Sequence, residues 1–156
     1  MTALDISPPP PDVPTGEWHD GLLLGYRPMD DTHQEFVVLV KRLRTAPDDE
    51  LPAVLDDFLA HIGRHFGEEE QWMSLDGYPA GDCHVEEHAA VMRSVLEVKA
   101  LVATGQRKVC RELAGALEEW FPLHAAYMDS ALAKWMVKRS TGGSPVVLRR
   151  RTSSTG

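Results

Sequence analysis

The chain has 156 residues, a length typical of one domain that can bury its own hydrophobic core. Its composition is that of an ordinary globular protein, with 43% apolar and 26% charged residues, and its formal net charge is −8. This acidic balance argues against a protein that binds nucleic acid or the anionic surface of a membrane.

The first 16 residues contain five prolines and few large apolar side chains, so we expect an extended arm over residues 1–16 rather than a helix. The arm has neither the positive nor the apolar region of a secretory signal, and the longest apolar runs of the chain are too short to cross a membrane. Cys83 and Cys110 form no CxxC pair, which favours reduced thiols. We therefore predict a cytoplasmic protein that does not insert into membranes.

Apolar residues recur at intervals of three and four along four segments, the pattern of helices that bury one face in a bundle. These segments span residues 31–44, 49–75, 82–104 and 107–138. Their connections are short, which places successive helices side by side in opposite directions. We predict an all-α fold over residues 17–138, an up-down-up-down antiparallel four-helix bundle. For residues 139–156 we expect a disordered basic tail, which we interpret as solubilising rather than as a contact for an acidic partner.

Five histidines fall on the apolar stripes, and each helix carries at least one. They are His33, His65, His84, His88 and His124. One histidine on an apolar face is usually a core residue with a hydrogen-bond partner. Five in one core would each need a partner, because an unpaired buried polar group costs about 1–3 kcal/mol. One metal centre would satisfy them together, since imidazole binds iron, copper, zinc and nickel.

The spacing within each helix groups these side chains further. Glu69 follows His65 by four residues, and His88 follows His84 by four, so each pair shares a helical face. His61 also lies four residues before His65, which leaves two possible frames for a ligand pair. We expect His61 to pack or to support a ligand rather than to bind metal itself.

Asp129 follows His124 by five residues, which separates the two by about 140° around an ideal helix. A local i→i+5 turn would align them, and such turns occur at functional sites. Pro122 favours an irregularity here, because it has no N–H to donate to the carbonyl of Glu118. We therefore predict a break in the regular hydrogen-bond ladder between residues 118 and 130.

The ordered set, H, then HxxxE, then HxxxH, then HxxxxD with one element per helix, resembles the hemerythrin family, specifically its single-domain bacterial members. The likeness extends from about Trp18 to Trp135. The segments that carry it are MDDTHQEF (29–36), HFGEEEQWM (65–73), DGYP (76–79), CHVEEH (83–88) and WFPLHAAYMD (120–129).

This resemblance implies a centre of two non-heme iron ions joined by an oxo or hydroxo bridge. Three histidines would bind one iron, two would bind the other, and two carboxylates would bridge both. The iron with two histidines would keep one open position, where O2 could bind. The positions in this chain are His84, His88 and His124 for one iron, His33 and His65 for the other, and Glu69 and Asp129 for the bridges.

The implied function is reversible O2 binding for carriage, storage or delivery, so we interpret the chain as a binding protein and not an enzyme. The alternatives are an O2 or redox sensor and a di-iron enzyme that reduces peroxide or nitric oxide. A structural zinc site would be closed and tetrahedral, which the mixed ligand set does not favour. Trp120 and Phe121 match an aromatic–leucine pair of many relatives and are expected to wall the O2 pocket, with core packing as the alternative for Trp120. We expect a monomer.

Overall fold

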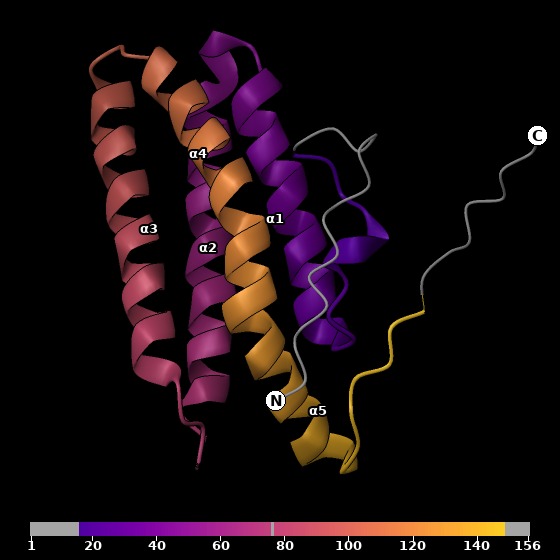
Figure 1. The fold of residues 1–156 in the computed structure, drawn as a ribbon. Coiled ribbons are helices and arrows are strands. Elements are labelled where there is room, and N and C mark those ends of the chain that lie inside the picture. The colour runs from indigo at the N-terminus through magenta and orange to yellow at the C-terminus, as the bar shows by residue number, and fades with distance from the viewer. Residues whose placement is uncertain (1–15, 76, 149–156) are drawn as a thin grey trace, which may run out of the picture.

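The computed structural model describes residues 16–75 and 77–148 (Figure 1). The predicted all-α, up-down-up-down four-helix bundle is confirmed. Its elements are η1 (Asp20–Leu22), α1 (Arg27–Thr45), η2 (Asp48–Glu50), α2 (Leu51–Met73), α3 (Gly81–Ala103), α4 (Lys108–His124), the π-helical η3 (Ala125–Asp129) and α5 (Ser130–Thr141). Most of the predicted arm and the Arg149–Arg151 run lie outside the described residues.

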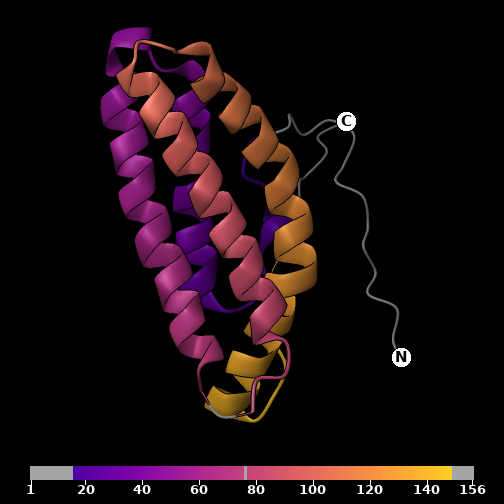
Figure 2. The same cartoon turned by 90° about the vertical axis from the view of Figure 1, so that its left-hand side faces the viewer.

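The helices form a ring in which each one packs against its two neighbours. Contacts join α1 to α2, α2 to α3, α3 to α4 and α4 back to α1, and the two views show the same order (Figures 1 and 2). Pro28 and Pro52 lie in the first turns of α1 and α2, where a missing N–H is tolerated. Gly105, with φ of +94°, follows the C-cap residue of α3, a position that favours glycine. Among the residues that the structure describes, no helix combines the length and the hydropathy of a membrane span.

The fourth predicted helix differs from the structure in two ways. It is divided into α4, η3 and α5, and it continues to Thr141, three residues beyond the predicted boundary. The hydroxyls of Ser140 and Thr141 donate to carbonyls one turn earlier, and Gly142 ends the helix with φ of +74°. Residues 139–141 therefore continue α5, whereas the sequence assigned them to a tail.

Residues 142–148 return along the segment that precedes α1. A Cβ atom built on Gly25 would lie only 2.7 Å from the Cβ of Pro145, so these two backbone segments approach closely. Gly25 also has φ of +82°, which suits glycine. Its N–H and that of Leu24 donate to the buried carboxylate of Asp30, which holds this segment against the start of α1.

Two apolar clusters fill the interior, one on each side of a polar layer. The larger one, here called the apolar half, is formed by Phe36, Val37, Val40, Leu43, Leu51, Val54, Leu55, Phe58, Ile62, Phe66, Val95, Val102, Cys110, Leu113, Ala114, Leu117, Phe121 and Ala125. The smaller one closes the opposite end and contains Met29, Met73, Leu132, Ala133 and Met136. The polar layer between them holds the predicted ligand residues.

Candidate metal centre

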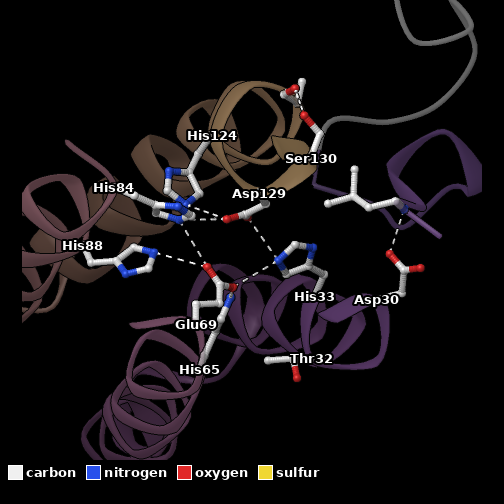
Figure 3. Close-up of polar contacts among 12 residues, drawn as sticks. Asp30, Thr32, His33, His65, Glu69, His84, His88, His124, Asp129 and Ser130 are labelled. Carbon is white, nitrogen blue, oxygen red and sulfur yellow. Dashed lines mark hydrogen bonds and ion pairs between the residues drawn. The ribbon is translucent and has the colours of Figure 1, made fainter. Parts of the chain in front are cut away.

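Seven ionisable side chains from α1, α2, α3, α4 and η3 meet in this layer (Figure 3). Each is at most 4% exposed to solvent. We call them the polar cluster, and its members are His33, His65, Glu69, His84, His88, His124 and Asp129. All seven predicted ligand positions are therefore brought together in one place.

Glu69 lies at the middle of the polar cluster and faces two separate sets of histidines. Its Oε1 atom is 3.2 Å from His84 Nε2 and 3.4 Å from His88 Nε2. Its Oε2 atom is 2.7 Å from His65 Nε2 and 3.5 Å from His33 Nε2. One carboxylate thus presents one oxygen to each set.

Asp129 divides its oxygens in the same way. Its Oδ1 atom is 2.9 Å from His84 Nε2 and 3.2 Å from His124 Nε2, whereas its Oδ2 atom is 3.1 Å from His33 Nε2. Both carboxylates therefore separate the same two groups. The three-histidine group is His84, His88 and His124, and the two-histidine group is His33 and His65.

The position of Asp129 depends on the π-helical segment η3. Residues Ala125–Asp129 adopt this wider turn directly after His124, so the predicted break between residues 118 and 130 is confirmed. The extra residue per turn brings Asp129 onto the face that carries His124, and both side chains are buried. An uninterrupted α-helix would leave the two on different faces.

The polar cluster has the unmet bonding capacity of a metal site. None of its seven side chains is exposed, yet the Nε2 atoms of all five histidines and all four carboxylate oxygens make no hydrogen bond of acceptable geometry, although several lie about 3 Å apart. Leaving so many buried polar atoms unpaired would cost about 1–3 kcal/mol each. Five imidazole nitrogens and two carboxylates, gathered in two groups whose ligand atoms lie within 4.8 Å of one another, fit a metal centre.

Without a metal, protons balance the two negative charges of this layer. Burial alone would lower the pKa of His33 and of His84, but their contacts with Asp129 and Glu69 outweigh it and raise each pKa to about 9. Burial would conversely raise the pKa of Glu69 and Asp129, and the surrounding histidines hold both pKa values below the usual range. Both carboxylates are therefore ionised near neutral pH.

Further side chains contact the outer nitrogens of the histidines. Glu87 Oε1 lies 2.8 Å from His124 Nδ1 and also accepts a 2.8 Å hydrogen bond from Trp120 Nε1. Glu70 Oε1 lies 3.6 Å from His88 Nδ1. Sequence spacing gave no signal for the Glu87 contacts, because they cross from α3 to α4 and do not follow one helix.

His61 lies outside the two ligand groups, as predicted, and contacts one of their members. It is 1% exposed, and its Nε2 atom is 3.3 Å from His65 Nδ1. Burial, with His65 as the next cause, lowers the pKa of His61 to about 4, so its imidazole is neutral near pH 7.

The two aromatic residues predicted to wall a pocket lie beside different histidines. Phe121 is 3% exposed, and its ring meets His33 edge-on at 5.0 Å. Trp120 is half-buried and stacks on His124 with ring centroids 4.2 Å apart. Phe121 thus borders the two-histidine group, whereas Trp120 borders the three-histidine group.

Comparison with known proteins agrees with this arrangement. The family model described as the hemerythrin HHE cation binding domain matches residues 24–136. The chain belongs to the hemerythrin family. It is 33% identical over 127 residues to a bacteriohemerythrin of Ralstonia nicotianae. This alignment covers 81% of this chain and 93% of the relative. A bacteriohemerythrin of Campylobacter jejuni subsp. jejuni is 28% identical over 112 residues, covering 69% of this chain and 84% of the relative. No solved structure matches significantly.

Proposed function

We propose that the chain binds O2 reversibly at a non-heme di-iron centre held by the polar cluster. One observation supports the proposal most strongly. Each of the two carboxylates presents one oxygen to the three-histidine group and the other oxygen to the two-histidine group. Glu69 and Asp129 would bridge the two irons, and the histidines of each group would bind one of them. When bound, the iron pair would supply the electrons that hold O2 and recover them when O2 leaves.

The unequal number of histidines makes the two proposed iron positions different. The two-histidine group offers one nitrogen fewer, so O2 is expected to bind on the side of His33 and His65. Phe121 and Phe36 lie next to that side, with their rings stacked 4.8 Å apart and almost no solvent exposure. Their apolar surface would keep water and protons away from bound O2 and so slow irreversible oxidation.

The ligand types favour a carrier over an oxygen-activating enzyme. Di-iron enzymes of the ferritin-like type use mainly glutamates, which supply negative charge to strongly oxidised iron. Here five of the seven side chains are imidazoles, and only Glu69 and Asp129 are acidic.

A monomeric state and a location in the cytoplasm remain predictions from the sequence.

The test is a visible absorption spectrum of the iron-loaded, anaerobically reduced protein before air, after air and after an argon purge. We expect a charge-transfer band that appears with O2, fades under argon and returns over repeated cycles. Immediate conversion to a stable ferric spectrum, with no form that depends on O2, would overturn the proposal. That result would favour a redox enzyme or a sensor, which turnover with peroxide or nitric oxide would then separate.

A further inference from the structure

A second buried histidine of α2 links the polar cluster to the surface. His61 Nε2 is 3.3 Å from His65 Nδ1, and on the other side of the ring His61 Nδ1 is 3.5 Å from Glu35 Oε2 of α1. His61 is fully buried, whereas the Glu35 side chain is 60% exposed. One imidazole therefore separates a candidate metal ligand from a surface carboxylate.

The outer end of this link opens into a surface pocket between α1 and α2. The pocket has a volume of about 520 Å³, and Asp31, Glu35, His61 and Arg64 are among its lining residues. The link is also the one outward contact of the two-histidine group among the described residues, because His33 Nδ1 has no hydrogen-bond partner. The three-histidine group differs, since His124 meets Glu87 directly.

The partners of His65 and His61 determine which ring nitrogen of each histidine carries the proton. His65 Nε2 faces Glu69 at 2.7 Å and must carry a free lone pair to bind a metal, so the ring proton must sit on Nδ1. That Nδ1–H can donate to His61 Nε2, which leaves the His61 proton on Nδ1. The nearest acceptor to this nitrogen across α1 and α2 is Glu35 Oε2 at 3.5 Å, and a carboxylate can only accept. The opposite arrangement would turn a lone pair of His61 toward a negative charge.

We propose that His61 and Glu35 act as a positioning pair that holds His65 in the tautomer able to bind metal. The proposal rests on the metal centre of the proposed function but not on reversible O2 binding. Outer contacts of this kind orient a ligand histidine, and their loss typically weakens metal binding about 10–100-fold. Because His65 belongs to one group only, the effect should fall on one of the two metal ions.

The test compares four variants of the full chain. Glu35→Ala removes the acceptor, and Asp31→Ala is its matched control, because it removes the same charge from the same helix and pocket. Asp31 is itself exposed and pairs only at 3.7 Å with exposed Arg27. His61→Leu removes the link, whereas His61→Gln keeps a side-chain oxygen that can accept from His65.

Two readouts are used. Anaerobic titration with Co(II) measures each binding step, and long-range ¹H–¹⁵N spectra of the protein saturated with Zn(II) report whether the Nδ1 proton of His65 is hydrogen-bonded. We expect Glu35→Ala and His61→Leu to weaken one step about 10–100-fold and to weaken or remove the hydrogen bond of the His65 Nδ1 proton. Asp31→Ala should match the unsubstituted protein, and His61→Gln should recover most of the loss.

Equal Co(II) binding and an unchanged hydrogen-bond signal of the His65 Nδ1 proton in all four variants would overturn the positioning role. A protein that binds two Co(II) ions with the expected variant pattern, but whose iron form fails to release O2, would contradict the proposed function and leave the positioning role intact. A general loss of folding is recognised by urea unfolding of each variant.

Discussion

The apolar half and the polar cluster are equally well buried, but their side chains differ in what they need from their neighbours. In the apolar half, side chains such as Leu43, Leu51 and Leu55 are at most 1% exposed and need no partner beyond packing. In the polar cluster, five imidazoles and two carboxylates lie at the same depth with most of their bonding atoms unpaired.

This difference indicates a division of roles along one bundle. The apolar half supplies the burial that folds the chain, since each large apolar side chain contributes about 1.5–3 kcal/mol. The polar cluster opposes folding until something binds its nitrogens and oxygens. Functional residues that lower the stability of a fold are common, because sites are selected for chemistry.

Phe121→Ala should have the largest effect, because Phe121 belongs to the apolar half and also touches His33. Loss of this buried ring should lower the free energy of unfolding by about 3–5 kcal/mol. It should also shorten the lifetime of the oxygenated form, since water would reach the two-histidine group. Urea unfolding and the decay of the O2-dependent absorption band measure the two effects.

Leu55→Ala is the matched control for this variant. Leu55 is 1% exposed in the apolar half, so its loss should lower the free energy of unfolding by a similar amount, about 2–5 kcal/mol. The lifetime of the oxygenated form should not change. Equal lifetimes in both variants would remove the proposed water-excluding role of Phe121.

Removing the metal should destabilise the protein by a comparable amount. A ligand that binds only the folded state at a thousand times its Kd stabilises it by about 4 kcal/mol. Chelation should therefore lower the urea midpoint of the iron-loaded protein, while the helical content of the metal-free protein at low urea stays high because the apolar half remains packed. Identical midpoints with and without iron would contradict the assignment of separate roles.

Glu87→Leu should have a smaller effect at the border of the polar cluster. It removes the shared acceptor of Trp120 Nε1 and His124 Nδ1, and a buried donor left without a partner costs about 1–3 kcal/mol. Glu87→Gln retains an acceptor oxygen and should recover most of this loss. Chemical denaturation of both variants checks the prediction, and equal stability of the two would show that the contacts contribute little.

The pH dependence should be the mildest difference and should appear only without metal. The pKa values of His33 and His84 are raised to about 9, so their contribution to stability is complete below the unfolded value of about 6.5. It is lost as the pH rises through 9. Urea unfolding at pH 6.5, 8 and 9 should therefore show a decline for the metal-free protein that is absent when metal replaces the protons. A flat profile for the metal-free protein would contradict this electrostatic account.

The sequence predicted those parts of the structure that depend on spacing within one helix. Pairs such as His65 and Glu69 had to share a face, and the five-residue step from His124 to Asp129 required the π-helical turn that is observed. The continuation of α5 to Thr141 was missed, because hydroxyl bonds to the preceding turn extended a segment that composition alone assigned to a tail.

Contacts between helices could not be predicted in the same way. The approach of Glu35 to His61 depends on how α1 packs beside α2, and the Glu87 contacts depend on how α3 packs beside α4. Neither follows from periodicity, because a helical repeat defines a face but not the rotation and height of the neighbouring helix.

The most direct test of the central claim is an anaerobic titration of the metal-free protein with Fe(II), followed by measurement of bound iron. We predict saturation at two ions per chain, and loss of paired binding in Glu69→Gln, because the oxygens of this residue face both histidine groups. Saturation at one ion, or no saturable binding, would contradict a di-iron centre in the polar cluster.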